Sequence, residues 1–292
     1  MRKTMTRWRL GARLGLVVAA VGALLTGGLM TTASDRAEAD PVRVAEFLAE
    51  CPLSHRLPDD PIVLPRLAGA SHSHDFFGNR STNANSDVGS LAGSSGNCNP
   101  APDISSYWVP TLYKGQQAIQ PSIITFYYLG EGVNRPQDIR PTPYGLKIVA
   151  GNAKATGDSD SIARWSCLHA GQVNPSKNFV NCPSGSQLET YLDFPQCWNG
   201  RDLDSSDHKS HMAYPVAGAC PSTHSVAVPK LRFVIRYPVN GDPSQFRLSS
   251  GAGNTYHGDF FNVWPTAEME RRVRVCINAV VKCGHDGYPN PA

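Results

Sequence analysis

The sequence predicts an all-β protein, a single domain with a β-sandwich or jelly-roll-like body. Short runs rich in aromatic and β-branched residues recur along the chain, and segments rich in Gly, Pro, Asn and Asp separate them. Beyond residue 50, apolar residues rarely repeat at the spacing of a helix. Many short strands joined by turn-rich spacers are typical of β-sandwiches and jelly rolls.

Seven segments are expected to form strands, and in chain order they are 107–113, 122–129, 145–150, 162–168, 188–194, 231–237 and 260–264. The clearest is 231–237, which places four large apolar side chains on one face and Arg232 and Arg236 on the other. This strand should be half buried.

Two other segments carry different signals. Residues 40–50 are predicted to form a short helix, with Pro41 in its first turn and apolar residues along one side. Residues 81–103 are rich in Ser, Asn and Gly, so we expect a long surface loop tethered by Cys98.

The N-terminal residues have the pattern of an export signal. Five basic residues precede an apolar stretch of 17 residues, 14–30, and Ala37-Glu38-Ala39 follows. This small-x-small motif suits signal peptidase, so we expect 1–39 to be a cleaved signal peptide and 40–292 to be one secreted, extracellular domain. An uncleaved membrane anchor is the alternative, although the apolar run is at the short end for spanning a bilayer.

Removal of the signal changes the charge balance. It holds 6 of the 27 Lys and Arg and 2 of the 24 Asp and Glu, which leaves 21 basic and 22 acidic residues and a formal charge of −1. A basic surface that binds the phosphate backbone of nucleic acids is therefore not expected, which argues against nucleic-acid binding. Without another long apolar segment, we also expect no membrane partner after cleavage.

Eight cysteines follow the signal, an even number that predicts disulfide bonds in an oxidising compartment. Eight cysteines permit about 105 connectivities, and the sequence alone does not choose among them. Spacing suggests the pairs Cys167–Cys182, Cys197–Cys220 and Cys276–Cys283, with Cys51–Cys98 left by elimination. Thiolate zinc sites are disfavoured because CxxC spacings are missing.

Two short histidine motifs, far apart in the chain, resemble each other. His72 and His74 share one face if 71–75 is extended, an arrangement that suits metal chelation or acid–base chemistry, or simply a polar strand edge. His257 and Asp259 share a face in the same way, so the carboxylate can orient the imidazole and stabilise its protonated form. Paired Phe residues follow both motifs, which suggests one polar site on an aromatic wall.

Residues 197–215 are the part of the chain densest in Asp and His. His211 precedes an apparent buried strand, so it is a stronger candidate than His208 for a functional group. The Asp-rich turn is an alternative calcium loop, but it lacks the central Gly and terminal Glu of an EF-hand.

Substrate-binding candidates are aromatic or charged side chains of the second half of the chain. Aromatic rings supply flat platforms for sugars, although most are core residues in β proteins, and Arg suits an acidic substrate group. The candidates are Trp198, Arg201, Asp202, Asp207, Tyr214 and Trp264.

Common catalytic motifs are missing from the sequence. It contains no GxSxG elbow, no Walker loop, no Rossmann glycine fingerprint and no HExxH helix. The remaining candidate chemistry is His/Asp acid–base work or a His-rich metal centre.

Three blocks, HSHDFFGN at 72–79, CWNGRDLDSSDHKSHMAYP at 197–215 and HGDFFNVW at 257–264, carry a resemblance to a known family. The chain resembles an uncharacterised secreted domain of unknown function of actinobacteria and filamentous fungi, in which carbohydrate-binding WSC modules are sometimes attached. The resemblance implies an extracytoplasmic, disulfide-containing domain that works near cell walls or polysaccharide. The matched positions are His72, His74, Trp198, Asp202, Asp207, His211, His257 and Asp259.

These observations support three hypotheses about function. The leading one is an enzyme, a lyase or hydrolase, that acts on polysaccharide or cell-wall glycan, with His257, oriented by Asp259, and His74 or His211 as acid and base. The second is a copper or zinc enzyme whose ligands are His72, His74, His211 and His257. The third is a noncatalytic, wall-associated glycan-binding protein in which the His and Asp residues form a structural hydrogen-bond network.

Overall fold

A computed structural model describes residues 45–168 and 175–289. The predicted signal peptide, 1–39, lies outside the described residues. Within the two described ranges, no helix has both the length and the apolar character needed to cross a bilayer.

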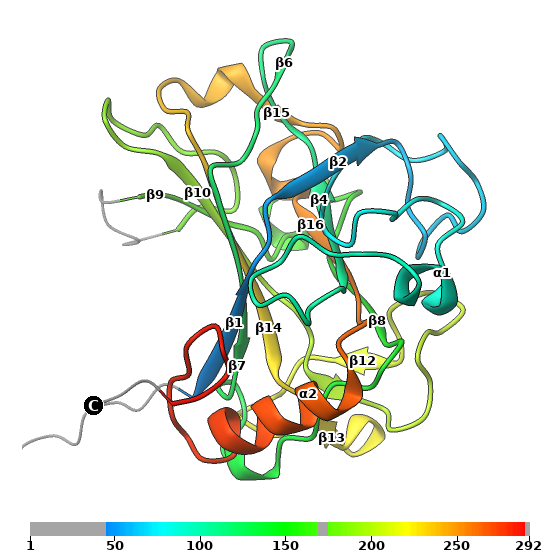
Figure 1. Ribbon diagram of the computed structural model, residues 1–292. Helices are drawn as coiled ribbons and strands as arrows, with labels where there is room; N and C mark the ends of the chain where they lie inside the picture. The colour runs from blue at the N-terminus through cyan, green and yellow to red at the C-terminus, as the bar shows by residue number, and fades with distance from the viewer. Residues whose placement is uncertain (1–44, 169–174, 290–292) are drawn as a thin grey trace, which may run out of the picture. The chain divides into compact units, whose positions relative to one another are not determined.

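Two five-stranded antiparallel sheets form the body of this domain, and the all-β prediction is confirmed (Figure 1). In order across the first sheet, the strands are β1 (Glu46–Glu50), β7 (Ile123–Leu129), β14 (Lys230–Tyr237), β10 (Leu188–Asp193) and β9 (Arg164–Cys167). In order across the second sheet, they are β2 (Leu53–Leu57), β3 (His74–Gly78), β4 (Ser106–Pro110), β16 (His257–Phe261) and β8 (Lys147–Gly151).

Smaller elements decorate this body. One three-stranded sheet contains β12 (Met212–Ala213), β11 (Cys197–Trp198) and β13 (Val226–Ala227), and another contains β15 (Phe246–Leu248), β5 (Leu112–Lys114) and β6 (Gln117–Ala118). The helices are α1 (Val88–Ala92) and α2 (Thr266–Arg272), and a π-helical turn, η6 (Val273–Ile277), extends α2. Short 3₁₀ turns are η1 (Pro136–Asp138), η2 (Asp158–Asp160), η3 (Ser222–His224), η4 (Pro243–Gln245) and η5 (Gly253–Thr255).

The main core lies between the two large sheets and is rich in aromatic rings. Tyr107 of β4 stacks on Phe126 of β7 with ring centroids 3.9 Å apart, and Phe233 of β14 packs edge-on against both. Gly258 of β16 permits this close approach, because a Cβ there would lie 2.8 Å from Leu192 of β10. Stacked and edge-on aromatic pairs add stability beyond the area that they bury.

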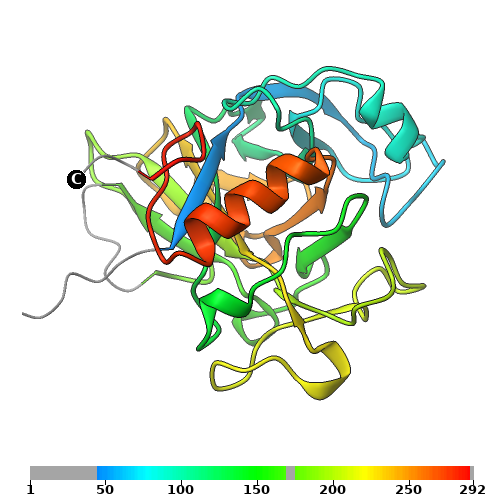
Figure 2. The same cartoon turned by 60° about the horizontal axis from the view of Figure 1, so that its bottom comes forward.

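Helix α2 and the turn η6 that follows it lie beside β1, and Met269 of α2 and Val273 of η6 belong to the main core (Figure 2). The Arg272 guanidinium lies over the Trp264 ring, 5.0 Å from its centroid, and Trp264 Nε1 donates to the Tyr128 hydroxyl. Trp264 is 0% exposed. The expectation that Trp264 offers a platform for a sugar was therefore wrong, because this ring is part of the core.

All seven expected strand segments contain a strand in the structure, with 107–113 divided between β4 and β5. The expected alternation in β14 is present, since its apolar face is buried while Arg232 binds Asp193 and Arg236 binds Glu189 on the other face. The predicted helix over 40–50 was wrong, because Glu46–Glu50 forms the edge strand β1. Residues 40–44 lie outside the described part of the chain.

Disulfides join the four pairs that the spacing suggested: Cys51–Cys98, Cys167–Cys182, Cys197–Cys220 and Cys276–Cys283. Cys51–Cys98 ties the segment 81–103 to the end of β1. That segment is more ordered than a surface coil, because it contains α1 and buries Leu91.

The outer face of the second sheet carries a second, smaller core. Along β16, Gly258 and Phe260 face the first sheet, while Phe261 packs on the outer face. The alternation of a strand therefore places His257 and Asp259 on the outer face as well. The smaller core comprises Ile62, Phe76, Leu91, Trp108, Val149, Phe261 and Val263. Ile62 belongs to the segment that follows β2, so this segment covers the face on which the histidines lie.

Candidate functional site

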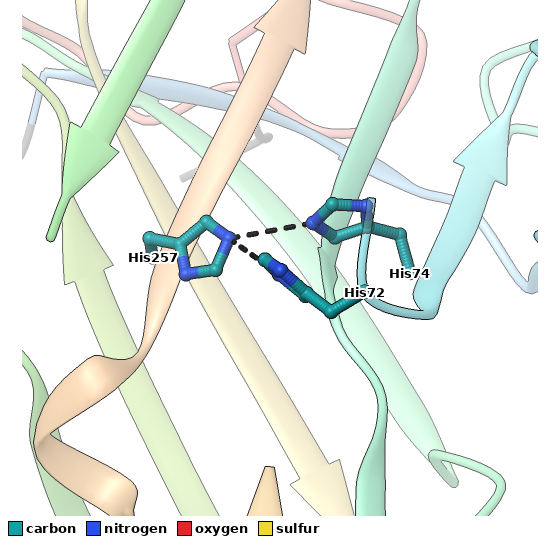
Figure 3. A group of neighbouring side chains, drawn as sticks. All are labelled: His72, His74 and His257. Carbon is teal, nitrogen blue, oxygen red and sulfur yellow. Dashed lines mark hydrogen bonds between the residues drawn. The ribbon is translucent and has the colours of Figure 1, made fainter. Parts of the chain in front are cut away.

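Three histidine rings from two segments of the second sheet converge on its outer face (Figure 3). His74 is the first residue of β3, His257 is the first residue of β16, and β4 lies between the two strands. The Nε2 atom of His257 lies 3.1 Å from Nε2 of His72 and 3.3 Å from Nε2 of His74. The two motifs that resemble each other in sequence therefore meet in space.

Backbone carbonyls fix the tautomers of the two buried rings. Nδ1 of His74 lies 2.9 Å from the Asp59 carbonyl oxygen, and Nδ1 of His257 lies 2.8 Å from the Thr255 carbonyl oxygen. Because a carbonyl only accepts, each Nδ1 must carry the proton and donate it. In the neutral rings, both Nε2 atoms then present a lone pair, and these two lone pairs face each other.

Burial keeps these imidazoles neutral. The pKa of His257 is lowered to about 3, first by burial and then by the nearby His72. The pKa of His74 is lowered well below its ordinary value by burial and by the two neighbouring rings, and burial also lowers the pKa of His72. A neutral imidazole with a free Nε2 is the form that binds a metal ion.

The separations of the ring nitrogens fit a single metal ion. Zn–N bonds are about 2.0–2.1 Å, so two nitrogens in tetrahedral positions lie roughly 3.4 Å apart. The two Nε2–Nε2 distances to His257 in the structure, 3.1 and 3.3 Å, are close to that separation. Donation of the other ring N–H to a backbone carbonyl, as His74 and His257 do, is the usual support of a metal-binding histidine.

A pocket of about 350 Å³ opens beside the rings. His72 and His257 line it together with Asp60, Asp259 and Lys209, and the remaining lining combines aliphatic side chains with the polar Ser71, Asn152 and Lys154. The site is therefore accessible to a ligand with both polar and apolar parts.

Asp259 does not orient His257 as the sequence suggested. The Nδ1 atom of His257 donates to the Thr255 carbonyl, and neither carboxylate oxygen of Asp259 has a hydrogen-bond partner among the described residues. Asp259 is 0% exposed, and burial, followed by the nearby Asp60, raises its pKa well above the ordinary value. The two side chains share a face and a pocket, but each is held differently.

His211 lies outside the group of three rings. Its Nδ1 lies 2.9 Å from Ser205 Oγ, and its Nε2 lies 2.7 Å from the Lys147 carbonyl oxygen, so both ring nitrogens have partners. His211 is bonded to Lys147, the first residue of β8, whereas the pocket residue Gly151 is the last residue of that strand. The structure therefore does not support His211 as an acid, base or metal ligand of the same site.

The Asp-rich turn satisfies its own carboxylates. Asp202 accepts from Asn199 and Arg201, and Asp207 accepts from the backbone N–H groups of Lys209 and Ser210. The turn is thus built by internal hydrogen bonds, and these carboxylates are engaged rather than presented to a cation or a substrate.

The other predicted substrate-binding residues have different surroundings. Trp198 is half-buried and donates from Nε1 to the Asp202 carbonyl oxygen, while Arg201 is exposed and pairs with the Asp202 carboxylate. Tyr214 is 43% exposed and lines a smaller pocket of about 180 Å³, which shares Lys209 with the larger one. Of the predicted aromatic platforms, Tyr214 is the one beside the histidine pocket.

Asp60 and Lys209 are charged residues of the pocket that sequence reasoning missed. Asp60 follows β2, and its Oδ1 accepts from the backbone N–H groups of Ile62 and Val63, which holds it against the site. Lys209 donates from Nζ to the Gly151 carbonyl oxygen, at the pocket rim. The doublet Asp59-Asp60 before Pro61 was a visible turn signal, but nothing in the sequence places it beside β16.

A family model described as "Domain of unknown function (DUF1996)" matches residues 60–264. The chain belongs to this family. The DUF1996 match begins at Asp60 and includes His72, His74, His257 and Asp259, so the whole candidate site lies inside it. Searches of curated proteins and of solved structures found no match.

Proposed function

We propose that this DUF1996 domain is a metal-dependent hydrolase whose ion, zinc or copper, is bound by Nε2 of His72, His74 and His257. The observation that carries the proposal is the pair of Nδ1–H groups donated to the carbonyls of Asp59 and Thr255, which turns two Nε2 lone pairs toward one point. Imidazole is a ligand for both zinc and copper. A bound cation removes the repulsion between the lone pairs.

Three protein ligands suit a catalytic ion better than a structural one, because a position stays open for water or substrate. The pocket of about 350 Å³ beside His72 and His257 gives a substrate access to that position. When bound, such an ion lowers the pKa of a coordinated water and polarises a carbonyl. Hydrolysis of an acyl group, as an ester or amide, fits this chemistry better than cleavage of a glycosidic bond, which usually employs two catalytic carboxylates.

For the substrate we propose an acylated extracellular polysaccharide. The predicted export signal and the disulfides support an extracytoplasmic site of action. The exposed ring of Tyr214, in the pocket that adjoins the histidine pocket, is suited to stacking on a sugar. Lys209, which lines both pockets, supplies a cation near an acidic sugar.

Acid–base catalysis by His257 and Asp259 has less support. A base works best when its pKa is near the operating pH, and the pKa of His257 is about 3. In addition, Asp259 does not hydrogen bond to His257, so the expected orienting contact is missing.

The test uses the exported protein, freed of metal by a chelator, and calorimetric titration with Zn²⁺ and with Cu²⁺. His257→Asn is the informative variant, because an Asn amide keeps a donor near the Thr255 carbonyl but removes Nε2. His211→Asn is the matched control, since both ring nitrogens of His211 are bonded elsewhere. We expect one ion per chain in wild type and control, and strongly weakened binding in His257→Asn.

Release of acetate or other acyl groups from a panel of cell-wall polysaccharides is then measured with and without the ion. Activity that requires the ion and is lost in His257→Asn supports a hydrolase. Binding of glycan without any release of product supports the noncatalytic hypothesis instead. Failure of wild type to take up either ion rules the metal site out.

A further inference from the structure

The pocket contains a buried carboxylate for which the three-histidine site provides no role. Asp259 is 0% exposed and lines the pocket, and neither of its oxygens accepts a hydrogen bond from the described residues. Burial of a charged group without a partner is strongly unfavourable, so such groups are rare unless a cation or a proton accompanies them. Asp259 therefore needs either a proton or a cation beside it in the pocket.

A second carboxylate is held next to it. Asp60 is 4% exposed, and the turn after β2 fixes it through Oδ1, which accepts from the N–H groups of Ile62 and Val63, each at 2.9 Å. Ligand atoms of Asp60, Asp259 and His74 all lie within 4.8 Å of one another. Two carboxylates from distant segments are thus brought together at the wall of one pocket, beside one of the three converging rings.

We propose that Asp60 and Asp259 bind a second divalent cation next to the histidine-bound ion, so that the pocket is a binuclear metal centre. The inference rests on the proposed function, which it deepens. Carboxylate oxygens suit harder ions such as Mn²⁺ and Mg²⁺, whereas the imidazoles suit zinc or copper, so the two positions differ in the ion that they select. His74 contributes to both groups of ligand atoms, which places the two positions side by side.

A divalent cation accounts for both features of the carboxylate pair. It neutralises the repulsion between Asp60 and Asp259, and it supplies the partner that Asp259 lacks. Neighbouring ions about 3.5–4 Å apart stabilise both the attacking and the leaving oxygen in hydrolysis. A second ion in this pocket would thus act on the same substrate as the first.

The test separates the two ions by order of addition. Metal-free full-length protein receives one equivalent of Zn²⁺, and Mn²⁺ is then titrated into it by calorimetry, with elemental analysis of the product. We expect one zinc and one manganese ion per chain. In Asp259→Asn we expect the zinc to remain and the Mn²⁺ affinity to fall by more than about 10-fold.

Asp60→Asn is a second variant that keeps the turn, because the amide oxygen can still accept from the N–H groups of Ile62 and Val63. Asp138→Asn is the control for the loss of one negative charge, since Asp138 lies at the exposed surface in an ion pair with Arg135. We expect weakened Mn²⁺ binding in the first and unchanged binding in the second. The melting temperature of each variant shows whether it folds.

The outcomes distinguish this inference from the function on which it rests. Zinc uptake without any Mn²⁺ uptake overturns the second position and leaves the three-histidine site standing. Loss of zinc together with manganese in the Asp variants also overturns it, because the carboxylates would then be ligands of the first ion. If wild type takes up no zinc, the proposed function itself has failed.

Discussion

Two regions of this molecule are rich in His and Asp, and they differ in how their polar atoms are used. In the turn from Asn199 to His211, each carboxylate and ring described above has a partner within the protein. Around His257, two lone pairs face each other and the carboxylate of Asp259 accepts no hydrogen bond from the described residues. Density of titratable residues in the sequence therefore did not identify the site. Unused bonding capacity in the structure did.

The largest expected effect that separates the two regions is on metal affinity. Structural zinc sites bind with about 10–16 kcal/mol shared among four ligands, so loss of one imidazole costs on the order of 3 kcal/mol, or roughly 100-fold or more in affinity. We expect this loss in His74→Asn and in His257→Asn, measured by titration with Zn²⁺. Equal losses in His211→Asn would show that the comparison between the regions is mistaken.

The second effect is a pH dependence of stability in the metal-free protein. The pKa of His257 is about 3 in the folded protein. It is about 6.5 in an unfolded chain, so on acidification the unfolded state gains a proton that the native state lacks. The stability that neutral His257 contributes is fully present above its unfolded-state pKa. It is lost as the pH falls from that pKa toward the folded-state pKa. At about 1.4 kcal/mol per pKa unit, His257 alone removes on the order of 3 kcal/mol between about pH 7 and about pH 4.

Urea unfolding of metal-free wild type and His257→Asn over this pH range measures the difference. Asp259 acts in the opposite direction, because burial raises its pKa, and its contribution is present in both proteins and cancels in the comparison. We expect wild type to lose more stability on acidification than the variant. Parallel losses would mean that His257 is not held neutral by burial.

A smaller effect is expected in the Asp-rich turn. His211 is 0% exposed and joins Ser205 to the Lys147 carbonyl, so His211→Ala removes two partly buried hydrogen bonds. We expect a loss of about 1–3 kcal/mol in the free energy of unfolding, with metal affinity unchanged. Chemical denaturation measures the first quantity and titration measures the second. An undiminished stability would argue against the structural role of this turn.

The smallest effect is expected at Arg201. Its guanidinium is exposed and pairs with Asp202, and ion pairs at the surface contribute little to stability because solvent screens them. We expect Arg201→Ala to leave the free energy of unfolding nearly unchanged and to leave activity on neutral polysaccharides unchanged. A large loss of activity would move the substrate site from the histidine pocket toward this turn.

The sequence predicted local features of the fold better than long-range ones. The alternation of apolar and charged side chains identified β14. The two His motifs placed His72, His74 and His257 among the candidates. Both predictions succeeded because strand periodicity can be recognised over a few residues. The local pattern predicted a helix for 46–50, but this segment is a strand. Pairing with β7 and burial of Phe47 outweigh the local helical pattern there.

The remaining parts of the site depend on how distant segments pack. Asp60 reaches the pocket only because the segment after β2 folds over the outer face of the second sheet. Trp264 belongs to the block 257–264 and His211 to the block 197–215, and both blocks were predicted to contain site residues. In the structure, Trp264 lies in the core and His211 is bonded to Lys147 of β8. Spacing along the chain carries no information about these contacts.

The proposed metal site requires that Nε2 of His72, His74 and His257 bind one ion. X-ray absorption of the protein loaded with one equivalent of Zn²⁺ counts these ligands. We expect three imidazole nitrogens at about 2.0–2.1 Å in wild type and two in His257→Asn. A spectrum without imidazole scattering, or one that is identical in wild type and His257→Asn, would contradict it.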